Sequence, residues 1–397
     1  MTARFMLALI LLVSSAHALV HVYEIALPSV EERIAGDYYG ADTAAGKQLT
    51  GRLSTAWRLM WGLGALLAGW LVDRFGSRRM LAIYLLGCAA TCVLVATSST
   101  QSSLFGAMIL MGALASIYHP AGLALISHET SADKLPRALG IHGIFGSLGI
   151  GITPFLAGAL LYGGCSWRQF YWLLMVPGAL LGAVFVHQSM RRAEGRIALD
   201  AADKVAGQRP DWLSFFTLTV MAALQGFVYS ALMAFLPRYL SRLQWAAWPE
   251  EGNGTFLASG VLLLGCFGQY LAGRFARTAL LERQLTCVLF ANAPLLLWMA
   301  LAIGWDRPVS AGLLSLVHFM HQPLYNSLIA KYTPRHRRSL CYGFSFAMGL
   351  GLGSFGALFA GGSESDLFVY GTLAVVAAVA GLIGLLLCAF NGPQRTT

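Results

Sequence analysis

Twelve long apolar segments, separated by short clusters of charged or turn-forming residues, make up most of this sequence. Each is close to the roughly 20 residues that a helix needs to cross the hydrocarbon core of a membrane. Such runs are too long and too apolar for barrel strands. We therefore predict an all-α membrane protein whose twelve transmembrane helices cover residues 5–28, 52–72, 80–98, 104–127, 138–162, 168–188, 212–236, 255–275, 284–304, 309–332, 338–362 and 367–390.

The composition indicates that lipid is part of the solvent of this chain. Its 397 residues are 57% hydrophobic and 11% charged, whereas about a quarter of the residues of a soluble domain are charged. In a soluble protein the net charge of +9 would suggest a nucleic-acid partner. We expect none here, because arginines that anchor cytoplasmic loops explain the charge. The seven cysteines are interpreted as small buried hydrophobes, not as disulfides or zinc ligands.

The first twenty residues imitate a cleavable signal peptide, with Arg4, an apolar run and the small-residue sequence Ala16-His17-Ala18. The apolar run continues to Leu27, however, and no soluble domain follows it. Cleavage would also leave an odd number of helices. We therefore interpret this segment as a retained first transmembrane helix.

The distribution of lysine and arginine predicts the orientation. If the N-terminus is cytoplasmic, most of the 27 basic residues fall on the cytoplasmic side. This bias places both termini in the cytoplasm, and we expect a multi-pass protein of a bacterial inner membrane. The longest cytoplasmic stretch, 189–211, is then a connector between an N-terminal six-helix bundle (1–188) and a C-terminal one (212–397).

The two halves also resemble each other at an offset near 200 residues. Arg74-Phe75 corresponds to Arg274-Phe275, and Pro120 corresponds to Pro323. A repeat of six spans is a plan of secondary transporters, which hold the substrate between the two repeats near the midplane. The pattern predicts two pseudo-symmetric six-helix bundles.

The loop after the second predicted helix carries a longer motif. It resembles the signature loop of the major facilitator superfamily, roughly G-x-L-x-D-R-x-G-R-R/K, although Ser77 replaces a basic residue. The resemblance implies that this loop acts in conformational switching and that the Asp73 carboxylate contacts the neighbouring bundle, with the helix start near Ser339 as a candidate partner. The second half has Gly273 in place of Asp73. The matching switch residues are Gly69, Asp73, Arg74, Gly76, Arg78 and Arg79.

The fifth predicted helix, 138–162, resembles the glycine pattern of antiporter branches of this superfamily, G-x8-G-x3-G-P-x2-G-G. The matching residues are Gly140, Gly149, Pro154 and Gly158, while Thr153 and Ala157 replace two glycines. The alternative is ordinary close packing of small residues around a proline bend.

Two shorter segments resemble the branch that contains fosmidomycin-resistance exporters and other drug–proton antiporters. They are His17-x3-His21-x-Tyr23 with Pro28, and His119-Pro120-Ala-Gly122. The basic residue that many drug antiporters carry in the fourth helix is missing, so the proton-relay scheme built on that residue is not carried over.

In this superfamily the first, fourth, seventh and tenth helices line the central cavity, and polar residues of this chain gather on those helices. By contrast, the third, sixth, ninth and twelfth are almost purely apolar, as lipid-facing helices are. The resemblance therefore implies a substrate cavity lined by Arg58 of the second helix together with Tyr118, His119, Gln225, Tyr229, His318, His321 and Tyr325.

Ionisable groups inside a bilayer are costly and are functional candidates. Glu24 is the only carboxylate well inside a predicted span, and Arg58 lies at a similar depth on the next helix. We expect these two to form an ion pair. The pair either takes part in proton coupling or only locks the two helices together.

Proton coupling requires a group that gains and loses charge. Arginine does not release its proton, whereas the pKa of a carboxyl responds to desolvation and to a nearby cation. We predict that Glu24 is paired in one state and protonated in another. His17 and His21, on the same helix face, would pass protons along the helix.

The sequence predicts neither an enzyme nor a cofactor. No nucleotide-binding loop of the G-x4-G-K-S/T type is present. His17 and His21 have the spacing of a helical metal pair, but no cysteine or carboxylate cluster completes a closed site, so no metal is expected.

These observations predict a monomeric secondary transporter that exports a small organic molecule in exchange for protons. A proton symporter or a facilitator for a small organic anion, drawn by Arg58 and the histidines, is the first alternative. A non-transporting membrane sensor with the same fold is the second.

Overall fold

The computed structural model describes residues 3–130, 135–191, 210–243, 252–334 and 338–391, and these form helices without any strand. The first half contains α1 (Ala3–Tyr39), α2 (Thr43–Phe75), α3 (Ser77–Ala96), α4 (Gln101–Ala115), α5 (Tyr118–Glu129), α6 (Leu135–Tyr162) and α7 (Trp167–Arg191). The second contains α8 (Trp212–Ser241), α9 (Asn253–Phe275), α10 (Leu281–Leu301), α11 (Asp306–His318), α12 (His321–Tyr332), α13 (Arg338–Phe346), α14 (Phe355–Gly361) and α15 (Asp366–Phe390).

These helices account for the twelve predicted spans. The fourth span is α4 with α5, and the tenth is α11 with α12. The eleventh is α13 and α14 joined by a π turn (Ala347–Gly351) and a 3₁₀ turn (Leu352–Ser354). Among the described residues, ten helical segments are long and apolar enough to cross a membrane. The other two spans are α2, whose first half is polar, and the α11–α12 pair, whose members are short.

Two of the broken helices have the same cause in equivalent places of the two halves. Pro120 follows the break before α5, and Pro323 follows the break before α12. Proline has no N–H to continue the helical ladder, and its ring clashes with the carbonyl four residues earlier, which is where each helix is broken. The correspondence of these two prolines thus appears in the structure as two matching breaks.

The end of the first helix is the main departure from the predicted boundaries. The sequence places this end at residue 28, but α1 continues past Pro28 to Tyr39, with irregular backbone at Val30. The longer helix carries Glu31, which is 2% exposed. Glu24 is therefore not the only buried carboxylate of α1.

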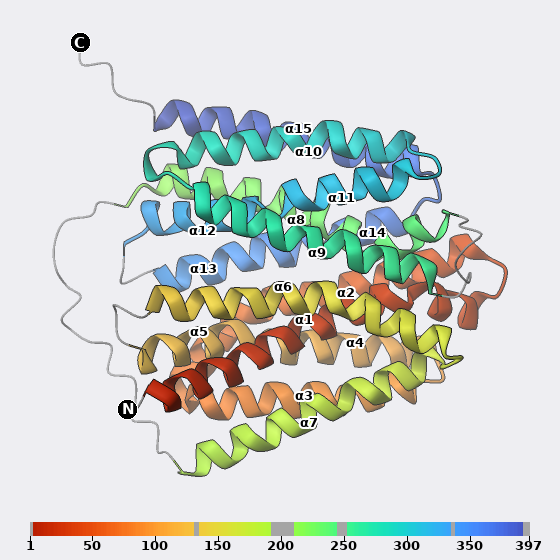
Figure 1. Ribbon diagram of the computed structural model, residues 1–397, viewed down its shortest axis with the longest axis horizontal. Coiled ribbons are helices and arrows are strands. Elements are labelled where there is room, and N and C mark those ends of the chain that lie inside the picture. Colours follow the sequence, from red (N-terminus) through yellow and green to blue (C-terminus); the bar gives the residue numbers. More distant parts are fainter. Residues whose placement is uncertain (1–2, 131–134, 192–209, 244–251, 335–337, 392–397) are drawn as a thin grey trace.

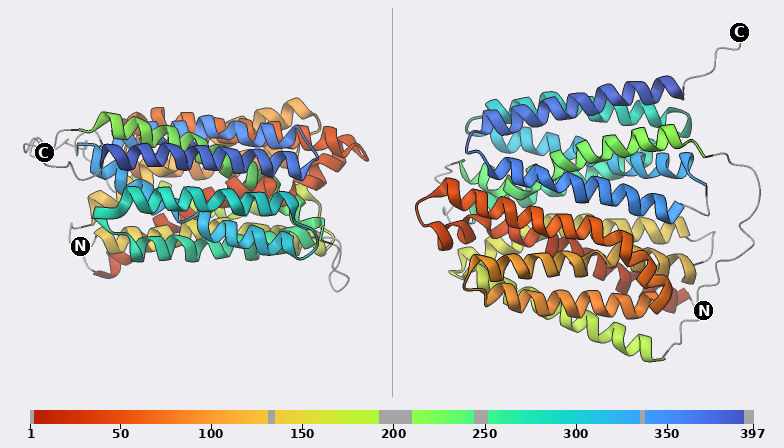
Figure 2. Two further views of the ribbon diagram at one scale, coloured as in Figure 1. Left: turned by 90° about the horizontal axis from the view of Figure 1, so that it is seen from above. Right: turned by 180° about the vertical axis from the view of Figure 1, so that it is seen from behind.

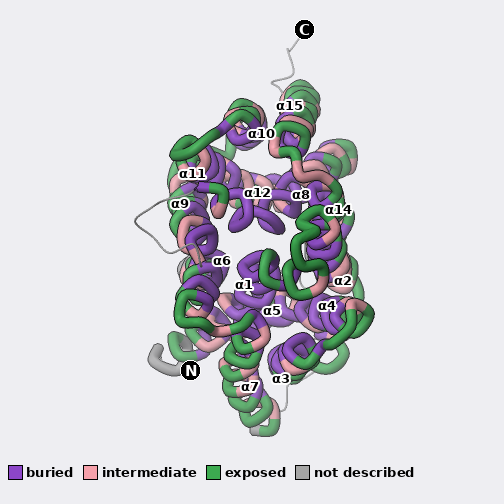
Figure 3. Tube along the Cα trace, turned by 90° about the vertical axis from the view of Figure 1, so that its right-hand side faces the viewer, coloured by how far each residue is buried: buried purple, intermediate pink, exposed green. Residues whose placement is uncertain are grey.

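The helices fall into two groups, α1–α7 and α8–α15, which form the lower and upper parts of Figure 1. In the second group α10 packs on α15, and in the first α3 packs on α7. These four helices lie at the outside of the two groups, with many exposed apolar residues, whereas α1 and α8 lie inside (Figure 3). Residues 192–209, most of the predicted connector, lie outside the described residues, so the domain boundaries stay a prediction.

The two ends of the molecule differ in what they hold. We call the end where α1 begins and α15 ends the terminal end, and the opposite end, where residues 40–42 join α1 to α2, the far end (Figures 1 and 2). Near the middle, α2 and the π turn approach closely, since a side chain at Gly62 would collide with the backbone of Gly351.

Charged side chains join the two halves at the far end. The Arg238 guanidinium of α8 donates to both carboxylate oxygens of Glu31, with Nε–Oε1 at 2.5 Å and Nη2–Oε2 at 3.1 Å. Lys47 of α2 donates to the carbonyl of Ser363. Both cations are buried. These contacts close the far end in this structure.

Candidate functional site

Glu24 lies at the centre of a buried polar cluster between the two halves. One carboxylate oxygen accepts hydrogen bonds from Arg58 of α2 and from the Tyr229 hydroxyl of α8, the latter at 2.9 Å. The other oxygen lies 2.7 Å from Nδ1 of His21, one turn earlier on α1. The expected Glu24–Arg58 ion pair is present. A single carboxylate thus connects the first half to the second.

Arg58 is held on two sides. Besides its pair with Glu24, its guanidinium carbon lies 5.2 Å from the centre of the Tyr229 ring. The side chain is only 1% exposed, which agrees with its place near the middle of α2. Its Nη2 atom is buried and has no hydrogen-bond partner among the described residues.

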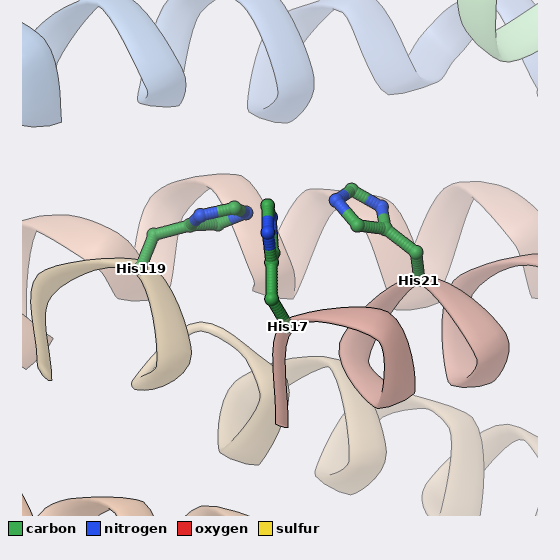
Figure 4. A group of neighbouring side chains, drawn as sticks. All are labelled: His17, His21 and His119. Atoms are coloured by element: carbon green, nitrogen blue, oxygen red, sulfur yellow. The ribbon is translucent and has the colours of Figure 1, made fainter. Parts of the chain in front are cut away.

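Three histidines converge beside this cluster (Figure 4). His17 and His21 project from one face of α1, and His119 projects from α5. One ring nitrogen from each lies within 4.8 Å of the others. The His119 ring also stacks on Phe346 of the second half, with 5.2 Å between the ring centres.

A fourth histidine, His142 of α6, was not among the predicted site residues. Its ring stacks on His17 at 4.1 Å between centres, and its carbonyl lies 2.8 Å from Nδ1 of His17. The family resemblance did not place the fifth helix at the cavity. The available signal was that His142 is the only charged or titratable side chain between Ile141 and Tyr162.

Tyr229 also connects Glu24 to the polar residues of the tenth span. Its ring is parallel to that of His318 of α11, with 6.1 Å between centres. Nδ1 of His318 lies 3.2 Å from Oδ1 of Asn292, and Nδ1 of His321 lies 2.6 Å from the carbonyl of His318. The structure therefore joins Tyr229, His318 and His321 to the Glu24 cluster.

The other predicted cavity residues have more varied surroundings. The Tyr118 hydroxyl donates to the Val13 carbonyl at 3.0 Å, inside the first half. Tyr325 is partly buried and packs against a hydrophobic cluster of the second half. Gln225 lies one turn before Tyr229 on α8 and is 2% exposed. The Tyr118 ring also stacks on His17, with 5.2 Å between the ring centres, so Tyr118 lies beside the histidines of the first half.

Several polar groups in and beside the cluster are buried without a hydrogen-bond partner among the described residues. They include Nη2 of Arg58, Nε2 of His119, both ring nitrogens of His142, Nε2 of His318 and both amide atoms of Gln225. An unsatisfied buried polar group costs about 1–3 kcal/mol, and native proteins leave few of them. These groups lie on both halves of the molecule.

The signature loop lies at the terminal end. Gly76 joins α2 to α3 at a φ of 88°, a left-handed conformation that favours glycine. Arg78 is buried and forms an ion pair with Glu129, whereas Asp73 and Arg79 are exposed. Arg74 lies over Trp70 at 5.8 Å, and Gly69 faces open space. The side chain of Ser339, the expected partner of Asp73, lies outside the described residues.

The glycine pattern of the fifth span lies along α6 together with Pro154. A side chain at Gly149 would collide with the Ala18 backbone of α1, and one at Gly158 would lie 2.5 Å from Oγ1 of Thr255 on α9. Gly140 lies in the first turns of the same helix. These approaches fit both the antiporter pattern and ordinary close packing.

The comparison with known families decides the class of this protein. The Major Facilitator Superfamily matches residues 14–358, which is most of the chain. The chain belongs to the Major Facilitator Superfamily. The fold predicted from the sequence is thereby confirmed, and this major facilitator is an integral, multi-pass membrane protein.

Two of its curated relatives are named as a resistance protein and as a probable antiporter. The chain is 32% identical over 192 residues to a puromycin resistance protein of Streptomyces alboniger, covering 47% of this chain and 35% of the relative. It is 28% identical over 251 residues to a probable nitrate/nitrite antiporter of Thermus thermophilus, covering 59% and 55%. The matches thus span between a third and about half of these relatives' lengths.

Solved structures share the fold at low identity. A bacterial homologue of the human lysosomal transporter Spinster, inward-facing and occupied, has a TM-score of 0.73 at 14% identity and covers 98% of both chains. The xylose transporter of E. coli has a TM-score of 0.76 at 12% identity, covering 96% of this chain and 99% of that one.

Proposed function

We propose that this major facilitator exports a small organic molecule in exchange for protons, and that Glu24 is the coupling group. The observation that carries the proposal is the bridge from Glu24 to Arg58 in one half and to Tyr229 in the other. The contact that crosses between the halves is the hydrogen bond from the Tyr229 hydroxyl, and this bond is strongest while Glu24 is charged. Protonation of Glu24 ends the ion pair with Arg58 inside the first half and weakens the hydrogen bond from Tyr229, which frees the halves to move.

The unpartnered polar groups around Glu24 support a binding site at the same place. Arg58 and Gln225 offer donors from opposite halves, and Gln225 also offers an acceptor. A polar solute bound here would contact both halves, as alternating access requires. Exchange for protons requires that the bound solute and the proton on Glu24 exclude each other, whereas a solute that displaced Glu24 from Arg58 would bind together with the proton, as in a symporter.

The His21–Glu24 contact supports a route for the proton. His21 is 13% exposed, whereas Glu24 is fully buried. His17 lies one turn further toward the terminal end, with 5.0 Å between the ring centres of His17 and His21. A proton entering on that side would pass through these imidazoles to reach Glu24.

A facilitator or symporter for a small organic anion is the second candidate. It is favoured by the unpartnered Nη2 of Arg58, which is buried and positively charged.

The proposed location is a bacterial inner membrane with both termini in the cytoplasm, and the proposed form is a monomer.

The Glu24→Gln variant tests the coupling role. A substrate is first found by a ligand-stabilisation screen and then followed in reconstituted vesicles. Because glutamine mimics the protonated carboxyl, we expect accumulation driven by a pH difference to be lost while substrate-for-substrate exchange persists. Retained pH-driven accumulation in the variant would exclude Glu24 as the coupling group. If the parent protein moves no substrate, the sensor alternative is favoured.

The matched control is Glu282→Gln. The Glu282 carboxylate is also buried, but it accepts from Lys331 at 2.5 Å and Tyr332 at 2.7 Å, all within the second half. This variant should keep proton-driven transport. If both variants lose it equally, the loss at Glu24 reflects general damage to the protein.

A further inference from the structure

The three converging histidines also have the arrangement of a metal-binding site. His17 and His21 alone have the spacing of a helical metal pair, and the fold adds His119 from a separate helix. We propose that His17, His21 and His119 bind a late first-row divalent ion such as Zn²⁺ or Co²⁺, with the fourth coordination position left open.

The hydrogen bonds of these imidazoles leave the correct atoms for a metal. Nδ1 of His17 lies 2.8 Å from the His142 carbonyl, and Nδ1 of His21 lies 2.7 Å from the Glu24 carboxylate. A ring whose Nδ1–H donates to a carbonyl or carboxylate presents the lone pair of Nε2. This is the usual second-shell arrangement of metal-binding histidines. Nε2 of His119 is buried without a hydrogen-bond partner among the described residues.

The chemistry of the donors selects the kind of ion. Three imidazoles suit Zn²⁺, Co²⁺, Ni²⁺ and copper, whereas Mg²⁺ and Ca²⁺ require oxygen ligands. Nitrogen atoms that share a tetrahedral Zn²⁺ lie about 3.3 Å apart, because each Zn–N bond is about 2.0–2.1 Å. The present separations, up to 4.8 Å, need a rotation of the rings toward one another.

Access and charge are compatible with a bound cation. His17 is buried, whereas His21 and His119 are partly exposed, although Nε2 of His119 is itself buried. The positive charge of Arg58, which pairs with the same Glu24 carboxylate that contacts His21, is neutralised by that ion pair. The Glu24 carboxylate, which contacts Nδ1 of His21, also favours a cation at Nε2 on the opposite edge of that ring.

The test uses purified, full-length protein from which any affinity tag has been removed. Co²⁺ is titrated into this protein, and the visible absorption bands of the ion are recorded. Four-coordinate Co²⁺ absorbs much more strongly than the hydrated ion. We expect one Co²⁺ per chain, displaced by Zn²⁺ and not by Mg²⁺. Affinity should fall at least tenfold in His17→Gln and in His119→Gln. The exposed His187 of α7 provides the matched control, so His187→Gln should bind as the parent does.

A second variant keeps the proposal testable if a glutamine variant does not fold. In His119→Cys the thiolate would join the coordination shell and add a sulfur-to-cobalt charge-transfer band. Absence of Co²⁺ binding in the parent would overturn the proposal, and so would unchanged binding in both glutamine variants. Since binding is measured without a gradient or a substrate, its outcome is independent of the proposed proton coupling.

Discussion

The ion pair that closes the far end allows a quantitative prediction. Arg238 and Glu31 lie on different halves, and their side chains are 9% and 1% exposed. In an Arg238→Gln variant the Glu31 carboxylate remains buried without its partner. The variant can relieve this cost by opening the far end, where water reaches the carboxylate. We therefore expect the balance between closed and open states to shift toward opening.

The size of the shift follows from the energetics of buried charges. Removing one partner of a buried ion pair costs about 3–5 kcal/mol. Because about 1.4 kcal/mol corresponds to a factor of ten, the open population should rise at least about 100-fold. The matched control is Arg242→Gln. Arg242 pairs with Asp366 at 2.7 Å within the second half, and its side chain is 33% exposed. Exposed pairs contribute about 0–1 kcal/mol, so at most about a fivefold change is expected.

The assay measures labelling of a cysteine that is covered when the far end is closed. Ala360 of α14 is 1% exposed and suits an Ala360→Cys probe, in a background whose seven native cysteines are replaced by alanine. The labelling rate with a polar maleimide reports the open population. Equal rates in the Arg238 and Arg242 variants, or no increase over the parent in the Arg238 variant, would refute the reasoning.

Three further outcomes are expected. Alkaline phosphatase fused after Gly207 should be inactive, and alkaline phosphatase fused after Gly252 should be active, because basic residues keep the connector in the cytoplasm. The reverse pattern would contradict the predicted orientation. Asp73→Asn should slow turnover while substrate affinity, measured by thermal stabilisation, stays within a few-fold; loss of both would indicate a role in folding. Gly62→Val should abolish transport in vesicles because its side chain would collide with the Gly351 backbone, and normal transport would show that this contact is dispensable.

The order and approximate positions of the helices could be predicted from the sequence. Apolar runs of spanning length are local features, and lipid leaves a backbone no alternative to hydrogen bonding within itself. The breaks at Pro120 and Pro323 are equally local, because each proline acts on its own helix. The Glu24–Arg58 pair was also foreseeable, since two opposite charges at similar depth on adjacent helices are costly unless they meet.

The contacts that assemble the candidate site depended on how the helices pack. Tyr229 reaches Glu24 and Arg238 reaches Glu31 across more than 200 positions of the chain. His119 and His142 join His17 from two other helices. The failure at the end of α1 is instructive: Pro28 and the charges that follow it look like a helix end, but Arg238 compensates Glu31 from the other half and the helix continues. Which face a helix turns toward its neighbour is set by side-chain packing over its whole length, and no single segment of sequence contains that information.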